Sequence, residues 1–145
     1  MLINLIVMLV QWTVVSFCYY QICFQVKYLK GDIFINNISG GITEAFSYAV
    51  GGVLLSFLGL KKGLISGYML GTIGMFSLLI YQGDSQIWLS IFICSSKFGI
   101  TSSFGICYFA NNEIFPAQAV VFCLGTCAAI GHIASIFSPE VAELK

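Results

Sequence analysis

The chain has 145 residues, of which 59% are apolar and 8% are charged, and its formal net charge is zero. A soluble domain carries about 25% charged residues, so this composition excludes an ordinary soluble globular fold. The balanced charge also excludes the basic surface that nucleic-acid binding requires, and no nucleic-acid partner is expected. We therefore predict an all-α protein, a polytopic bundle of transmembrane helices whose first partner is the lipid bilayer.

Five apolar stretches are long enough to cross the membrane, since a spanning helix needs about 20 residues for ~30 Å of hydrocarbon. The predicted spans of this single membrane domain, 1–145, are about 3–26, 33–60, 63–81, 87–112 and 117–138. The first stretch is about twice as long as the apolar core of a signal peptide, and no Lys or Arg precedes it, so we expect it to span rather than to be cleaved. Short polar segments separate the stretches, at 27–32, 59–63, 82–86 and 111–116. Such short loops make successive helices antiparallel.

Small residues within the spans indicate close helix packing. Gly67 and Gly71 form a G-x-x-x-G pair, which is typical of a face where another helix approaches closely. All six cysteines lie within apolar runs, and none has the spacing of a metal-binding pair. Cys123 and Cys127, four residues apart, share one helix face. We interpret the cysteines as small packing residues and expect no metal and no cofactor.

Three ionisable residues lie within the spans: Glu44, Lys97 and His132. A charge at the bilayer centre costs at least ~2.5 kcal/mol, so each should face protein or a water-filled cavity. Lys97 either extends to the interface, forms a structural ion pair or sets the charge of a site. Glu44 and His132 are either hydrogen-bonded packing residues or groups that contact a solute. Motifs for hydrolytic catalysis are absent from the sequence, so we expect no enzyme.

Several motifs resemble one transporter family. The sequence K-F-G-I at 97–100, the E-I-F-P at 113–116, and the residues Tyr108, Gly125, Ile136 and Pro139 are similar to helices ten and eleven of the organic ion transporter branch of the major facilitator superfamily. F-C-Y-Y at 17–20 resembles its helix seven, and G-D-I-F-I-N at 31–36 resembles the start of its helix eight. L-G-L-K-K at 58–62 resembles the turn between helices eight and nine. Glu44 lies where helix eight of that family carries its acid.

The resemblance implies that the chain equals helices seven to eleven of a twelve-helix carrier. Such a carrier works by alternating access between two six-helix halves, so the implied partner is a missing N-terminal six-helix half, and the implied substrate is a small organic ion or solute. The turns at 59–63 and 111–116 would be cytoplasmic, and the loops at 27–32 and 82–86 would face the opposite side. The implied substrate-lining residues are Tyr19, Tyr20, Glu44, Lys97 and His132.

The resemblance also implies a cytoplasmic gate formed by Lys61, Lys62 and Glu113, and we expect Glu113 to lie within a few ångströms of one of the lysines. Other gate charges of the family are replaced here by Ser56, Phe57 and Val120. His132 stands where cation-preferring members carry Asp and anion-preferring members carry Arg, so the sign of the substrate is left open. Small neighbours along its helix predict that His132 faces the interior of the bundle.

A second interpretation is a non-transporting helical subunit that packs into a larger membrane complex. A pore of several copies is not favoured, since no selectivity-filter sequence is present. In every interpretation the chain is an integral, multi-pass membrane protein, and the sequence does not indicate which membrane holds it.

Overall fold

The computed structural model describes residues 2–26, 33–81 and 85–143, and all regular structure in these ranges is helical. The helices are α1 (Leu2–Val26), α2 (Ile33–Ile80), α3 (Gln86–Ile114), α4 (Val120–Ser135) and α5 (Ser138–Glu143). The predicted all-α fold is thus confirmed for the described residues. The expected loop at 27–32 and most of the loop at 82–86 lie outside them.

Within the described ranges, four segments are long and apolar enough to cross a membrane, namely Leu2–Phe24, Ile33–Ile80, Ile87–Ile114 and Val120–Val141. The prediction of five spans is not confirmed, because the second and third predicted spans both fall within the one apolar segment Ile33–Ile80. The helices nevertheless place the chain in a bilayer as a multi-pass protein.

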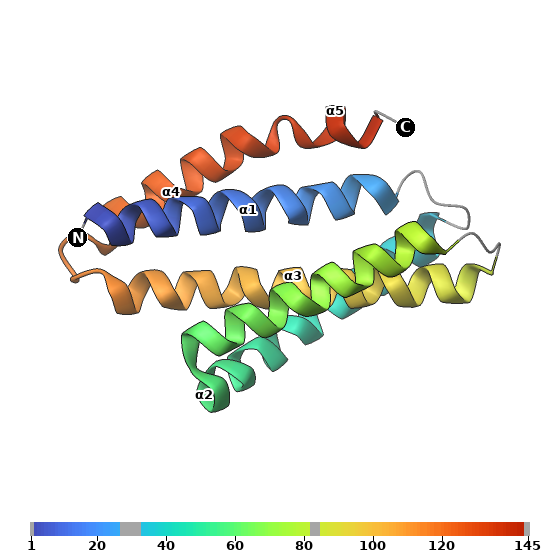
Figure 1. Ribbon diagram of the computed structural model, residues 1–145, viewed down its shortest axis with the longest axis horizontal. Coiled ribbons are helices and arrows are strands. Elements are labelled where there is room, and N and C mark those ends of the chain that lie inside the picture. The colour runs from blue at the N-terminus through green and yellow to red at the C-terminus, as the bar shows by residue number, and fades with distance from the viewer. Residues whose placement is uncertain (1, 27–32, 82–84, 144–145) are drawn as a thin grey trace.

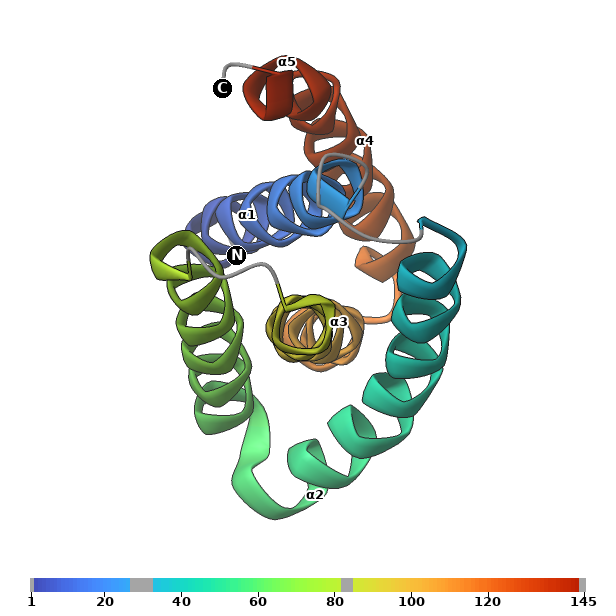
Figure 2. The same cartoon turned by 90° about the vertical axis from the view of Figure 1, so that its right-hand side faces the viewer.

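Helix α2 folds back on itself at Gly59. This residue has φ 73° and ψ 173°, a backbone conformation that only glycine adopts without strain. The arms before and after Gly59, residues 33–58 and 60–80, lie on opposite sides of α3 (Figure 2). The turn is shorter than the predicted segment 59–63, because Lys61 and Lys62 already belong to the helix of the second arm.

Prolines mark two helix boundaries in the second half of the chain. Helix α3 continues through Asn112 to Ile114 and ends at Phe115, which is extended because it precedes Pro116. The expected helix over 117–138 is divided into α4 and α5. Pro139 lies in the first turn of α5 rather than ending the preceding helix, because its missing N–H has no helical partner at that position.

Helix α3 forms the centre of the bundle, with α1 and both arms of α2 around it, and α4 and α5 lie along α1 on the outer side (Figures 1 and 2). The core on α1 and α3 includes Trp12, Val15 and Ile106. Gly67 and Gly71 are buried against α3, so the predicted close-packing face is confirmed. Cys107, Cys123 and Cys127 are buried packing residues, as predicted.

The start of α1, the turn of α2 and the connection from α3 to α4 lie at one end of the bundle (Figure 1). The first residues of α2 and of α3 lie at the other end. Residues that lie the same number of positions after the first residue of α2 and of α3 are therefore at the same depth in the bundle. This arrangement brings the polar residues of the candidate site together.

Candidate functional site

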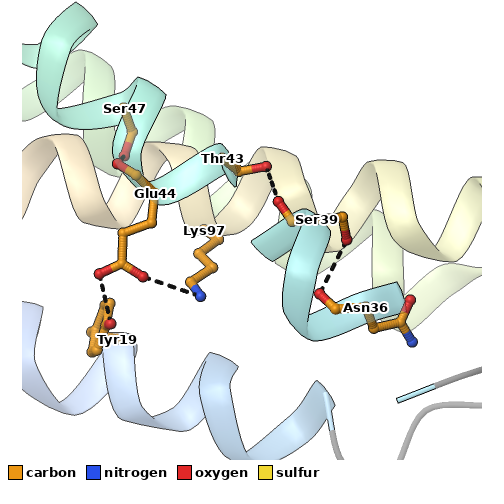
Figure 3. Close-up of polar contacts among 7 residues, drawn as sticks. All are labelled: Tyr19, Asn36, Ser39, Thr43, Glu44, Ser47 and Lys97. Carbon is orange, nitrogen blue, oxygen red and sulfur yellow. Dashed lines mark hydrogen bonds and ion pairs between the residues drawn. The ribbon is translucent and has the colours of Figure 1, made fainter. Parts of the chain in front are cut away.

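A polar contact joins three helices at the centre of the bundle. The Tyr19 hydroxyl on α1 donates a hydrogen bond of 2.8 Å to Glu44 Oε1 on α2, and Lys97 Nζ on α3 lies 3.2 Å from Glu44 Oε2 (Figure 3). The ammonium also lies 6.0 Å from the centroid of the Tyr19 ring. Both carboxylate oxygens of Glu44 are therefore engaged. The three residues predicted as substrate-lining on separate helices thus form one contact.

The depth of this contact follows from helix geometry. Glu44 and Lys97 each lie 11 residues after the first residue of their helix, since α2 begins at Ile33 and α3 at Gln86. At a rise of 1.5 Å per residue, both are roughly 16 Å from the same end of the bundle, about half of a ~30 Å hydrocarbon layer. Lys97 does not extend to the interface but forms the expected ion pair, and its role in setting the charge of a site stays a prediction.

The ion pair is partly shielded from solvent, with 14% of the Lys97 side chain and 25% of the Glu44 side chain exposed. At 3.2 Å the attraction is about 5 kcal/mol for an effective dielectric constant of about 20. Desolvation of both groups offsets most of this gain, so the pair contributes little to net stability, whereas removal of one partner leaves an uncompensated charge. Paired ionisable residues at this depth are typical of substrate and ion pathways.

Aromatic side chains line a groove beside the ion pair. Its volume is about 200 Å³, and its lining residues are Tyr19, Tyr20, Tyr48 and Phe104. The centroid of the Tyr19 ring lies 5.5 Å from the centroid of the Tyr20 ring and 6.0 Å from that of the Phe104 ring. Electron-rich faces of such rings attract cations, and their bodies accept apolar groups. The groove can therefore hold a small organic molecule next to a carboxylate and an ammonium.

Tyr48 and Phe104 line the groove but were not predicted from the sequence. Tyr48 is one helical turn after Glu44 and so shares its face, a spacing that could have identified it. Phe104 carried no signal, because it is one of 13 phenylalanines in an almost wholly apolar chain.

His132 lies at the edge of this site. The centroid of the imidazole ring is 6.2 Å from the centroid of the Tyr20 ring, so His132 approaches α1 as expected. Its side chain is exposed rather than buried among the described helices, and its orientation toward the interior of the whole bundle stays a prediction. The buried strip of α4 consists of residues four apart, namely Cys123, Cys127, Gly131 and Ser135. His132 follows Gly131 directly and is therefore rotated by about 100° from that strip.

The three predicted gate residues do not form a pair. Lys61, Lys62 and Glu113 are all exposed. Within the described part of the chain, Glu113 forms no ion pair with either lysine, so the expected contact is wrong. The turn of α2 lies on the side of α3 away from α4, which separates it from the connection that follows α3 (Figure 2).

The fold and the site define a multi-pass helical membrane protein with a charged, aromatic-lined contact at mid-depth. No known family profile matches the chain. Human organic cation/carnitine transporter 2 is 23% identical over 133 residues, which are 92% of this chain and 24% of the relative. Solute carrier family 22 member 4 of Mus musculus is 26% identical over 134 residues, which again are 92% of this chain and 24% of the relative.

A third relative, solute carrier family 22 member 15 of Xenopus tropicalis, is 23% identical over 148 residues, 97% of this chain and 28% of its own length. The chain thus spans about a quarter of the length of the curated relatives that it matches. It is homologous to the solute carrier family 22 organic ion transporters of the major facilitator superfamily, the branch that its motifs resemble. These relatives are transporters rather than enzymes.

Proposed function

We propose that this chain contributes helices seven to eleven of a carrier that moves small organic ions across a membrane by alternating access. The observation that carries the proposal is the Tyr19–Glu44–Lys97 contact, which holds a carboxylate and an ammonium at mid-depth beside an aromatic groove. A passive membrane anchor gains little from such a pair, because desolvation cancels most of its attraction. A carrier uses it to bind a charged solute away from water.

In this proposal the two arms of α2 cross the membrane separately, so the chain has five spans, at about 3–26, 33–60, 63–81, 87–112 and 117–138. Their antiparallel course on either side of α3 supports this assignment (Figure 2). The turn at Gly59 and the connection after α3 lie on the cytoplasmic side. An N-terminal six-helix half completes the site, since the groove between the halves of such carriers lies near the bilayer midplane.

The ion occupies the groove next to Glu44 and Lys97, with Tyr19, Tyr20 and Tyr48 contacting its apolar parts. His132, exposed beside Tyr20, contributes a polar edge. Lys61, Lys62 and Glu113 act near the cytoplasmic opening as separate charges. The names of the relatives, organic cation and carnitine transporters, support a charged organic solute of small size.

The test uses the complete protein that the transcript carrying this sequence encodes, reconstituted into lipid vesicles. Uptake of labelled tetraethylammonium, carnitine and benzoate covers a cation, a zwitterion and an anion. We expect saturable uptake of at least one of them, and a decrease of about tenfold or more in Glu44→Gln and in Lys97→Met.

Thr126→Val is the matched control, because the Thr126 hydroxyl donates only to the Phe122 carbonyl of its own helix. It should leave uptake unchanged. Absence of saturable uptake for all three compounds, with the protein correctly inserted, would contradict the proposal and favour a non-transporting subunit.

A further inference from the structure

Gly40 lies directly against the side chain of Lys97. A Cβ atom added at Gly40 would be 3.2 Å from Lys97 Nζ, 3.6 Å from Cδ and 3.9 Å from Cε. Three successive atoms of the lysine are therefore in contact with this one position. The next residue, Gly41, has nothing within 4 Å of its added Cβ.

Gly40 precedes Glu44 by four residues, so both lie on the same face of α2 one turn apart. The lysine side chain crosses α2 at Gly40 and ends at Glu44, where its ammonium is 3.2 Å from Oε2. Gly40 itself is buried. A side chain at position 40 would occupy the space through which Lys97 reaches the carboxylate.

We propose that Gly40 is a positioning residue that sets the charge of the aromatic groove by letting Lys97 reach Glu44. With the pair formed, both oxygens of Glu44 are engaged, and the two charges beside the groove neutralise each other. With Lys97 displaced, the carboxylate beside the groove loses its counter-ion, which shifts the preference from anions toward cations. The geometric part of this inference is independent of transport, whereas the effect on ion preference rests on the proposed function.

The geometric part is tested by the thermodynamic coupling between Glu44 and Lys97. Melting temperatures in detergent are measured for the unsubstituted protein, Glu44→Gln, Lys97→Met and the double variant, and the non-additive part is the coupling. We expect a coupling of about 2–4 °C. It should disappear in the Gly40→Val background, because the two added methyl groups block the lysine.

The Gly41→Val background is the matched control, with the same change in helix propensity but open space at the side chain, and should keep the coupling. Gly40→Ala provides a milder variant if Gly40→Val does not fold. Its single methyl group shifts the ammonium by only a few tenths of an ångström and should reduce the coupling partly. Full coupling in every folded Gly40 variant would overturn the proposal.

The effect on ion preference is tested by the ratio of tetraethylammonium to benzoate uptake. We expect Gly40→Val to raise this ratio by about tenfold relative to Gly41→Val. In a Lys97→Ala background, where no lysine is left to displace, Gly40→Val should leave the ratio unchanged.

An equal change of the ratio in both backgrounds would overturn the role of Gly40, because the substitution would then act without Lys97. If neither the unsubstituted protein nor any variant transports either ion, the proposed function is wrong. The coupling measurement alone then decides whether Gly40 positions Lys97.

Discussion

Replacing Gly99 with alanine should force α3 away from the second arm of α2. An added Cβ at Gly99 would lie 2.6 Å from the Gly67 carbonyl oxygen and 2.9 Å from Gly71 Cα, and it would also meet the Gly71 nitrogen. These are all backbone atoms, so no change of rotamer can relieve the overlap. The helices must separate by roughly 1 Å to restore an ordinary contact, which forfeits a quarter to a half of the local dispersion attraction.

The magnitude follows from two opposing effects. Overpacking of this kind lowers the free energy of unfolding by up to about 3 kcal/mol, while the higher helix propensity of alanine raises it by about 1 kcal/mol. Gly99→Ala should therefore lower the free energy of unfolding by about 2 kcal/mol. Gly52→Ala is the matched control, since nothing lies within 4 Å of a Cβ at that position. It should gain up to about 1 kcal/mol. The two variants therefore differ by about 3 kcal/mol, or roughly 10 °C in melting temperature for a chain of this size.

The assay is thermal unfolding in detergent micelles with a thiol-reactive fluorescent dye, because Cys107, Cys123 and Cys127 are buried and become reactive on unfolding. Gly99→Ala should melt below the unsubstituted protein and Gly52→Ala at or above it. A Gly99→Ala protein that melts as high as Gly52→Ala would refute the argument from backbone contact.

Three further predictions follow from single contacts and from topology. Tyr68→Phe should lower stability by about 1 kcal/mol, because the Tyr68 hydroxyl donates a 2.6 Å hydrogen bond to Gln11 Oε1 and its loss leaves that oxygen unpaired. The measurement is the melting temperature, and an unchanged value would argue against this contact. In a cysteine-free background, Lys61→Cys and Glu113→Cys should react with an impermeant maleimide from the same side of sealed vesicles, and reaction from opposite sides would exclude the five-span arrangement. His132→Phe should leave the melting temperature nearly unchanged, since the side chain is exposed, and a large decrease would mean that the imidazole is a packing residue.

The amino-acid pattern alone identifies the chain as a helical membrane protein and indicates several residues of the site. A single uncharged run of about 20 residues crosses hydrocarbon as a helix, because a helix satisfies every backbone polar group within the segment itself. Glu44 and Lys97 stood out because charges within such runs are costly. The order of motifs indicated the transporter family, which the relatives then confirmed.

Which of these residues are in contact depends on how the helices pack. Tyr19 and Glu44 are 25 residues apart in the chain, and the contact between them depends on how α1 packs beside α2. The absence of an ion pair at Glu113, within the described residues, depends likewise on the direction that α2 takes after Gly59.

The orientation of each helix was beyond the sequence for a physical reason. In a soluble protein the buried face of a helix is apolar and the outer face polar, so the pattern reveals which side packs. In a bilayer the lipid-facing residues are apolar as well, and the packing faces are distinguished mainly by small residues. The small neighbours of His132 on α4 therefore did not identify the buried face, and the strip that includes Gly131 is the one that packs against α1.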